Sequence, residues 1–475
     1  MFGSACHSKQ LADEKNNGAE GAATLEEAGD GGGGGSGGEP HGRQRPADQE
    51  PLGDVFGCED GHDIKYKTLS WPLVATLMIT EIVSYGLFAL PSTLADVGVV
   101  PGIAIIFFLG VFATYTARAL IHFKLRHPHV HNMGDAGMVL FGPIGRDVFG
   151  AGTVVFAVFA AGSQIHAGQL ALSVVSGGRL CAVALGAIFS AAMALASLRR
   201  TLGSLGLLSV AGSASIVVAG VAGLVGAVVA PVRPGEVQIA VARDFTTAFI
   251  SVTNPVFAYT GHSIFFVLIS EMKNPQDAMK AATTLQITAT SLYIVFALVS
   301  YWYIGSGVSS TSLLSLSPLW QKIAFAFAIP NFLIGGSLYS HVGSKLVFIR
   351  LFRRTKHMYS HTTLGWGVWT LLIVLANVAA FLFAVGIPIF NYLVNIASAA
   401  FLAWYTYGLA GAFWLHDTYY FKGGSRAWFQ RPLMFAVNIF TVLAGALICI
   451  GGLYVTIVAL IRASEAGELP PPFQC

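Results

Sequence analysis

Charged residues are scarce in this chain. Asp, Glu, Lys and Arg make up 11% of its 475 residues, whereas a soluble globular protein carries about 25%. The net charge of +3 is too small to indicate a nucleic-acid partner. The sequence also lacks a phosphate-binding lysine loop, a metalloprotease helix motif and a nucleophile elbow. These absences argue against an ATP-driven pump and a membrane hydrolase, and we expect neither enzymatic activity nor a cofactor.

Metal-ligand patterns are missing as well. The five cysteines show no paired or zinc-type spacing, so we expect inert thiols. His127, His129 and His131 alternate in one polar segment, but no cysteines or carboxylates accompany them in tetrahedral spacing. The sequence therefore predicts no metal site.

Large apolar residues are rare in residues 1–68, which include a glycine-rich run at 29–38. Such a segment cannot bury enough apolar surface to offset its chain entropy, so we expect a disordered cytoplasmic tail. It also lacks the basic region and apolar core of a cleaved signal peptide. We therefore expect the first membrane helix to act as the insertion signal.

Long apolar runs dominate the rest of the chain, and 54% of all residues are hydrophobic. A run of about 20 apolar residues spans the core of a lipid bilayer. We predict an all-α membrane protein with eleven transmembrane helices in a membrane domain at 69–462, followed by a short tail at 463–475. The predicted spans are 71–96, 101–122, 148–174, 180–198, 204–230, 244–269, 281–305, 319–350, 363–386, 388–415 and 432–461.

The lysines and arginines between these spans predict the orientation. With the N-terminus in the cytoplasm, sixteen lie inside and five outside, in agreement with the positive-inside rule. An odd number of spans then places the C-terminus outside. The five outer residues are Arg179, Arg233, Arg243, Lys322 and Arg462.

Glycine interrupts the helical pattern of two predicted spans, at 84–86 in the first and at 258–262 in the sixth. Broken helices at matching positions of two halves are typical of an inverted-repeat transporter. A break exposes N–H groups on one side and C=O groups on the other, which attract an anion and a cation respectively. Two facing breaks would therefore bind a zwitterion. The alternative is that the glycines only permit close helix packing.

Three segments resemble motifs of the amino acid/auxin permease family. Residues 81–91 look like its first-helix motif, and 123–137 look like the loop after the second helix in its fungal branch. Residues 257–262, followed by 269–275, resemble that branch's sixth-helix motif. The resemblance extends from about Tyr66 to Phe435 and is strongest to the fungal neutral amino acid permeases.

The resemblance implies a fold of eleven helices with a five-plus-five inverted repeat and broken helices 1 and 6. It also implies uptake of neutral amino acids, usually driven by protons in fungi, at the plasma membrane or the vacuole; we favour the plasma membrane. The substrate carboxylate would meet the backbone of the first break, and the ammonium would meet carbonyl groups at both breaks. The implied substrate-binding residues are Ile82, Ser84, Tyr85, Gly86, Leu87, Phe257, Ala258, Tyr259 and Thr260.

The sequence departs from the family pattern at Tyr85 and Phe88, where smaller residues are common. Both side chains are bulky. The size of the binding pocket and the range of substrates therefore stay open.

Glu81 is the principal candidate for proton coupling, because it lies within the first span about one turn before the break. A carboxylate at that depth is costly unless it is protonated or paired. The alternative is a structural ion pair or a packing hydrogen bond.

His341 and Lys345 share one face of the eighth span, which in this fold class meets the first helix where relatives bind sodium. We expect either residue to replace that ion with a positive charge, and we expect Lys345 to couple with Glu81. The alternatives are an ordinary packed histidine and a lysine that reaches the interface. His262, next to the second break, is a further candidate relay, with a structural role as its alternative.

Two alternatives to a proton-coupled importer remain open. One is a sodium-coupled or vacuolar amino acid exchanger, and the other is an amino acid sensor on a transporter scaffold. Lys345 disfavours sodium because it would compete with the ion, and the long N-terminal segment motivates the sensor.

Overall fold

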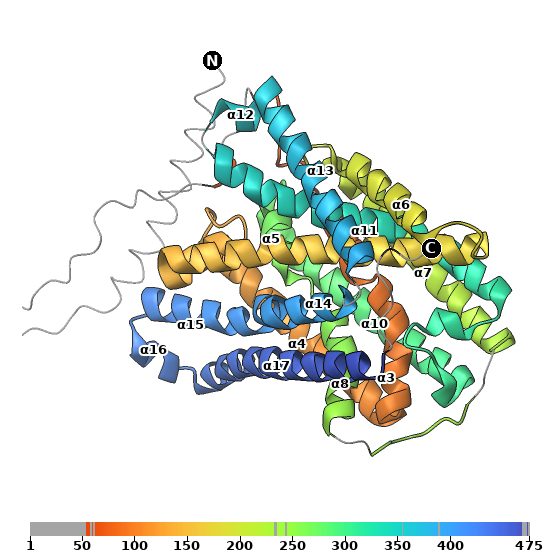
Figure 1. Ribbon diagram of the computed structural model, residues 1–475. Coiled ribbons are helices and arrows are strands. Elements are labelled where there is room, and N and C mark those ends of the chain that lie inside the picture. Colours follow the sequence, from red (N-terminus) through yellow and green to blue (C-terminus); the bar gives the residue numbers. More distant parts are fainter. Residues whose placement is uncertain are drawn as a thin grey trace, which may run out of the picture.

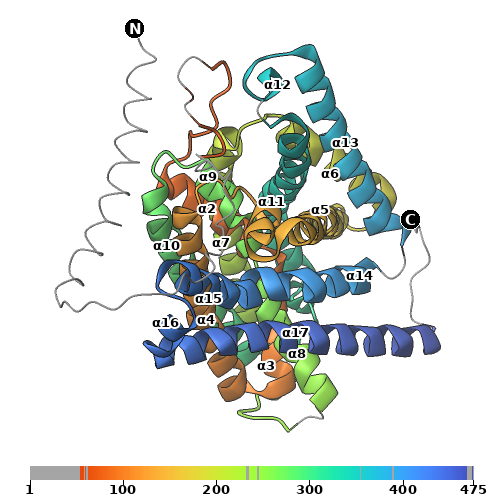
Figure 2. The ribbon, with the colours of Figure 1, turned by 90° about the vertical axis from the view of Figure 1, so that its left-hand side faces the viewer.

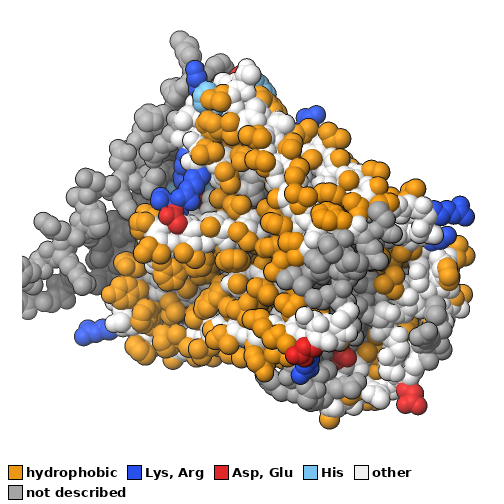
Figure 3. Space-filling view, viewed as in Figure 1, with side chains coloured by type: hydrophobic (Ala, Val, Ile, Leu, Met, Phe, Trp, Pro, Cys, Tyr) orange, Lys and Arg blue, Asp and Glu red, His pale blue; other side chains and the backbone are white. Residues whose placement is uncertain are grey.

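The computed structural model describes residues 54–57, 59, 62–231, 235–242, 245–353, 355–387, 390–467 and 473. Within these ranges the chain is almost entirely helical, and its β structure is limited to two isolated bridges. The long helices pack side by side into one bundle (Figures 1 and 2). Hydrophobic side chains cover much of the face in Figure 3, with Lys and Arg mostly near its edges. This is the surface of an integral membrane protein.

Each predicted span overlaps a helix or a pair of helices. The bundle consists of α2 (Trp71–Ile82) with α3 (Leu90–Val97), α4 (Val99–Arg126), α5 (Met133–Ser176), α6 (Ala182–Ser197), α7 (Gly203–Val229), α8 (Phe245–Ala258) with α9 (Phe265–Ser270), α10 (Ala278–Ile304), α11 (Pro318–Phe352), α13 (Thr363–Gly386), α14 (Phe390–Ala397) with α15 (Leu409–Phe421), and α17 (Pro432–Glu465). The short helices α12 (Lys356–Tyr359) and α16 (Ser425–Phe429) lie between the long ones.

The helix lengths agree with the positions of the predicted spans but not with their full number. Among the described residues, nine helices are long and apolar enough to cross a membrane, and the pair α2–α3, bent by 42°, gives a tenth span. The predicted span 180–198 corresponds to α6, which has only 16 residues. The count of eleven therefore stays a prediction.

The packing of the helices follows a repeat of five. Helices α4, α5 and α6 of the first half contact α10, α11 and α13 of the second half, respectively. Each pair occupies equivalent positions in the chain order of the two halves. Helix α5 also contacts α14, just as its counterpart α11 contacts α7. This reciprocity is what two inverted halves produce when they pack around a shared centre.

The boundary at residue 68 between the N-terminal tail and the membrane domain stays a prediction. Residues 1–53 lie outside the described part of the chain, but the segment from Asp54 onward packs against one end of the bundle. Phe56 stacks on Tyr66 at 4.5 Å between ring centroids, and the Tyr66 hydroxyl donates to the Met358 carbonyl at 2.9 Å. Leu69 donates its N–H to the Glu271 carbonyl. These contacts hold the described residues of this segment against the bundle.

Candidate functional site

The two predicted helix breaks face each other inside the bundle. Helix α2 ends at Ile82, and a short 3₁₀ helix, η1 (Tyr85–Ala89), follows it. Helix α8 ends at Ala258, and the 3₁₀ helix η2 (His262–Ile264) leads into α9. A Cβ atom on Gly86 would lie 3.5 Å from Cα of Ala258. The backbones of the two breaks are therefore in direct contact, as a binding site shared between them requires.

A cavity of about 420 Å³ lies against both breaks. Its other walls come from α5, α11, the segment before α11, and the wide π-helical turn η6 (Ser398–Gly408). π-Helical turns are frequently found at functional sites. The lining residues are Glu81, Ile82, Ser84, Tyr85, Gly86, Ala89, Phe156, Ala160, Ser163, Gln164, His166, Asn254, Phe257, Ala258, Thr260, Ser310, Thr311, Tyr339, Val394, Asn395, Ser398 and Leu402.

Most of the predicted substrate-binding residues line this cavity. The exceptions are Leu87 and Tyr259, which are buried away from it. Tyr259 instead donates to Thr290 at 3.1 Å and packs edge-on against Tyr293. The irregular turns at the breaks rotate these two side chains into the protein. Sequence position alone did not reveal that rotation.

Two side chains stabilise carbonyl groups that the breaks expose. The Tyr293 hydroxyl lies 2.8 Å from the Ile82 carbonyl oxygen and 2.7 Å from that of Ala258, so it joins the two breaks. The side-chain amide of Asn331 donates to the carbonyls of Thr80 and Val83 at 3.2 and 3.4 Å. A buried carbonyl without a donor is costly. These neutral donors therefore help to hold the unwound backbone in place.

Glu81 is the one carboxylate that lines the cavity. Its side chain is almost fully buried, and the hydroxyl of Tyr339 donates to Oε1 at 2.7 Å. The second oxygen, Oε2, has no hydrogen-bond partner among the described residues. It faces the second break, because a Cβ added to Gly261 would overlap it. The acid thus contacts both breaks and the cavity.

The expected pairing of Glu81 with Lys345 is not what the structure contains. Lys345 forms a buried ion pair with Glu271, just beyond α9, and neither side chain lines the cavity. The other carboxylate oxygen of Glu271 accepts the N–H of Leu202 at 3.0 Å. Lys345 also lies over the Tyr66 ring, 5.1 Å from its centroid. The ion pair therefore ties α9, α11 and the N-terminal segment together at one end of the bundle.

The two candidate histidines also lie outside the cavity. His262 is fully buried, and its Nε2 lies 3.1 Å from the Ala113 carbonyl. His341 is buried against Trp369, and its Nδ1 lies 3.4 Å from the Ser197 carbonyl. Each ring has a second nitrogen without a hydrogen-bond partner among the described residues. Both side chains support the packing of neighbouring helices.

The two bulky side chains that differ from the family pattern lie in different places. Tyr85 lines the cavity, where its hydroxyl bonds to Thr311 and its ring meets Phe332 edge-on at 6.1 Å. Phe88 is buried against Phe296 and does not line the cavity. Tyr85 alone therefore limits the space next to the first break.

One group of side chains has the spacing of metal ligands. His127, His416 and Asp417 offer atoms that lie within 4.8 Å of one another. Asp417 is already engaged by Arg126 at 3.2 Å and by His127 at 3.0 Å. Arg126 contacts Oδ2 of Asp417, whereas both histidines lie against Oδ1. The guanidinium group so close to the carboxylate would repel a bound cation, so the arrangement suits an ion-pair network better than a metal. The alternating histidines of the sequence contribute only His127 to it.

Comparisons with known proteins agree with this architecture. Residues 67–458 match the family described as Transmembrane amino acid transporter protein. Proteins named Transmembrane transporter from Fusarium pseudograminearum and Gibberella moniliformis are each 27% identical over 427 residues, which cover 88% of this chain and 89% of theirs. An N amino acid transport system protein from Neurospora crassa is 27% identical over 428 residues, which cover 88% of this chain and 90% of its own.

Among solved structures, a Na⁺-coupled sialic acid symporter in a substrate-bound outward-open state is similar to this chain. The TM-score is 0.52 at 11% identity, and the match covers 82% of this chain and 90% of that one. Such a low identity shows the fold alone. Because that neighbour has an inverted-repeat fold, the match confirms the predicted fold class.

Proposed function

Because the chain belongs to the transmembrane amino acid transporter family, the amino acid/auxin permeases, we propose that it takes up neutral amino acids by proton symport. In this proposal it works by alternating access, at the plasma membrane and with its N-terminus in the cytoplasm. The observation that carries the proposal is Glu81, a buried acid between the two helix breaks that lines the cavity and is held by a neutral hydroxyl.

The backbone of the two breaks supports binding of a zwitterion. Tyr85 and Gly86 begin η1, so their N–H groups have no partner within that helix and are available to a carboxylate. The carbonyls of Ile82 and Ala258 already meet the Tyr293 hydroxyl, but each oxygen has a second lone pair for an ammonium group. The substrate's charged groups would thus lie across the contact between the breaks.

The remaining lining favours an uncharged substrate side chain. No Lys or Arg is among the lining residues of the described cavity, so an acidic side chain would have no counter-ion. Phe156, Ala160 and Leu402 form apolar wall instead. Aliphatic and aromatic side chains would bury their surface there at a gain of about 25 cal/mol per Å².

The surroundings of Glu81 support the proposed proton coupling. A buried carboxylate with no cationic partner is costly in its charged form, and among the described residues the only hydrogen-bond partner of the Glu81 carboxylate is the Tyr339 hydroxyl. Protonation removes that cost, and deprotonation becomes easier when the cavity admits water or a substrate ammonium. The acid would therefore load and release a proton as access to the cavity alternates.

The decisive experiment is uptake of labelled neutral amino acids into proteoliposomes without sodium and with an acidic exterior. Accumulation that a protonophore abolishes is the expected result. Gly86→Leu, which fills the contact with Ala258, is expected to abolish this uptake. Unchanged uptake by that variant would mean that the substrate binds elsewhere.

The alternatives make different predictions in the same assay. Accumulation that requires sodium would support a sodium-coupled carrier and overturn the role of Glu81. Exchange without net accumulation under either gradient would support the exchanger. Binding without any transport would support an amino acid sensor.

A further inference from the structure

A second cavity, distinct from the substrate cavity, lies between α4, α15 and α17 at the end of the bundle that contains Lys422 and Arg431. It has a volume of about 390 Å³. Four lining side chains are Lys or Arg and one is a carboxylate, and the rest are mainly aromatic or apolar. The basic residues are Arg118, Arg126, Lys422 and Arg431, the acid is Asp417, and His122 lies among them.

The described residues compensate only part of the positive charge of this basic cavity. Asp417 is bound by Arg126, His127 and His416. Over the described ranges, no carboxylate lies within ion-pair distance of Arg118, Lys422 or Arg431.

The cations also affect one another. Burial, together with the nearby guanidinium groups of Arg431 and Arg126, lowers the pKa of Lys422. This direction is the one expected when like charges gather around a space without an anion. The cavity therefore has the electrostatics of an anion site.

The depth of Arg118 narrows the class of anion. Arg118 is exposed on the surface of α4 and precedes the end of that helix, Arg126, by eight residues, which is about 12 Å. Its Nε donates to Nε2 of His122 at 3.4 Å, but this contact supplies no negative charge, and a cation at that depth on a lipid-facing helix is costly without a counter-ion. Phe413, Trp414 and Met434 line the same cavity, so the anion site has an apolar wall that a small hydrated ion does not need.

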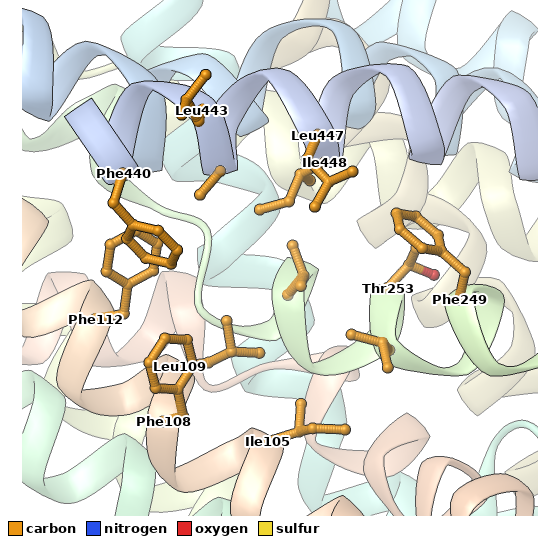
Figure 4. Close-up of a pocket in the computed structure, with 13 residues that line it drawn as sticks. Ile105, Phe108, Leu109, Phe112, Phe249, Thr253, Phe440, Leu443, Leu447 and Ile448 are labelled. Carbon is orange, nitrogen blue, oxygen red and sulfur yellow. The ribbon is translucent and has the colours of Figure 1, made fainter. Parts of the chain in front are cut away.

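A third cavity continues between the same two helices. It has a volume of about 450 Å³ and lies between α4, α8 and α17 (Figure 4). Its lining is hydrophobic except for Thr253. Phe112 of α4 and Phe440 of α17 meet at its edge, 5.6 Å apart between ring centroids. Many of its side chains, including Phe108 and Leu443, are largely exposed and face the region of lipid.

The two cavities adjoin along α4, because Tyr115 lines the basic cavity and Phe112, about 4.5 Å further along the helix axis, lines the apolar cavity. From Arg118, in the basic cavity, to Ile105, at the far end of the apolar cavity, α4 advances about 20 Å. Half of a hydrocarbon core is about 15 Å. A phosphate held at the basic end would therefore place its acyl chain at the apolar cavity.

We propose that the groove between α4 and α17 is a binding site for an anionic phospholipid. The headgroup phosphate lies between Arg118, Lys422 and Arg431, and an acyl chain follows the groove to the apolar cavity. Guanidinium groups suit this role because their fork of donors matches phosphate oxygens. Basic pockets between membrane helices on the cytoplasmic side are typical sites for anionic headgroups. The lipid would hold α17, which lies outside the five-plus-five repeat, against α4.

The test uses the full-length protein in phosphatidylcholine nanodiscs with increasing amounts of phosphatidylserine, read out by thermal unfolding. We expect stabilisation that saturates. Arg118→Gln and Arg431→Gln are each expected to weaken the apparent affinity for phosphatidylserine about five-fold, because each surface cation contributes about a factor of five to binding. Arg426→Gln is the matched control, since Arg426 is exposed nearby but does not line the cavity.

Three results would overturn the proposal. One is equal weakening by Arg426→Gln, which would indicate diffuse surface charge. Another is equal stabilisation by inorganic phosphate or glycerophosphoserine in pure phosphatidylcholine, which would indicate a small-anion site. The third is a wild-type protein indifferent to phosphatidylserine. Melting of each variant in pure phosphatidylcholine checks its folding, and native mass spectrometry of retained phosphatidylserine gives a readout independent of stability.

Discussion

The hydroxyl of Tyr339 lies 2.7 Å from Oε1 of Glu81, and this contact joins α11 to the broken first helix. The second oxygen of Glu81 faces Gly261 in the other break. One buried acid thus contacts α11, both breaks and the cavity between them. Its partner is a neutral donor, so Glu81 is able to change its protonation state without breaking an ion pair.

We predict that Glu81→Gln separates transport from coupling. The amide keeps the size and hydrogen-bonding capacity of the side chain but cannot release a proton. Exchange of labelled for unlabelled substrate should persist in proteoliposomes, while accumulation driven by an acidic exterior is lost. Glu465→Gln, at an exposed end of α17, is the matched control. Proton-driven accumulation by Glu81→Gln would remove this residue from the mechanism.

Gly261→Ala should abolish uptake. The added Cβ would overlap Oε2 of Glu81 and the side chain of Ile82, and a packed interior relaxes only partly around such a clash. The breaks must then move apart. Gly367→Ala is the control, because a Cβ at Gly367 meets nothing within 4 Å. Uptake rates normalised to surface expression measure the effect, and equal rates for the two variants would contradict it.

Tyr293→Phe should destabilise the protein by about 1–3 kcal/mol, the cost of leaving a buried acceptor without its donor. The hydroxyl meets carbonyl groups of both breaks, so its loss also loosens their contact. The melting temperature of the purified protein and its affinity for substrate should therefore both decrease. If the melting temperature and the affinity both stay at the wild-type level, the hydroxyl does not hold the breaks together.

The ion pair of Lys345 and Glu271 should show strong coupling in a double-mutant cycle. Removing one partner of a buried pair leaves an uncompensated charge, which costs about 3–5 kcal/mol. Lys345→Met and Glu271→Gln should each be severely destabilised, and the double variant should be more stable than the sum of the two losses implies. Lys345→Met combined with Glu81→Gln should be additive. A non-additive result for Lys345→Met with Glu81→Gln would instead support the pairing of Lys345 with Glu81 that the sequence suggested.

Tyr85→Ala should widen the range of substrates. Tyr85 projects along the cavity wall to Thr311 and Phe332, so its truncation opens space beside the first break. Competition of labelled substrate uptake by a series of neutral amino acids should shift toward larger side chains. Phe88→Ala is the comparison, since Phe88 does not line the cavity, and its order of preference should remain that of the wild type.

The sequence by itself determined the helices and the breaks. Apolar runs of bilayer length have few other stable states, because lipid offers no hydrogen bonds to backbone groups. Glycines at positions 86 and 261 marked the irregular turns, and Glu81 stood out as an acid within an apolar run. Glu271 carried a similar signal, an acid directly after a span and inside a segment used for the family resemblance, and a search for its partner would have reached Lys345.

Only the tertiary structure decided which residues meet. Spacing along one helix identifies a face but not the helix that the face contacts, so Lys345 was assigned to Glu81 although Glu271 lies against it. Tyr293 and Tyr339 gave no signal, because a tyrosine in a membrane helix is common and its hydroxyl acquires a role only from the carbonyl or carboxylate opposite it. Leu87 and Tyr259 were expected in the cavity, and the turn geometry of the breaks directs them into the protein. The sequence specifies the type and position of each residue. Which residues contact one another depends on distances between segments that are far apart in the chain, and the order of residues does not specify those distances.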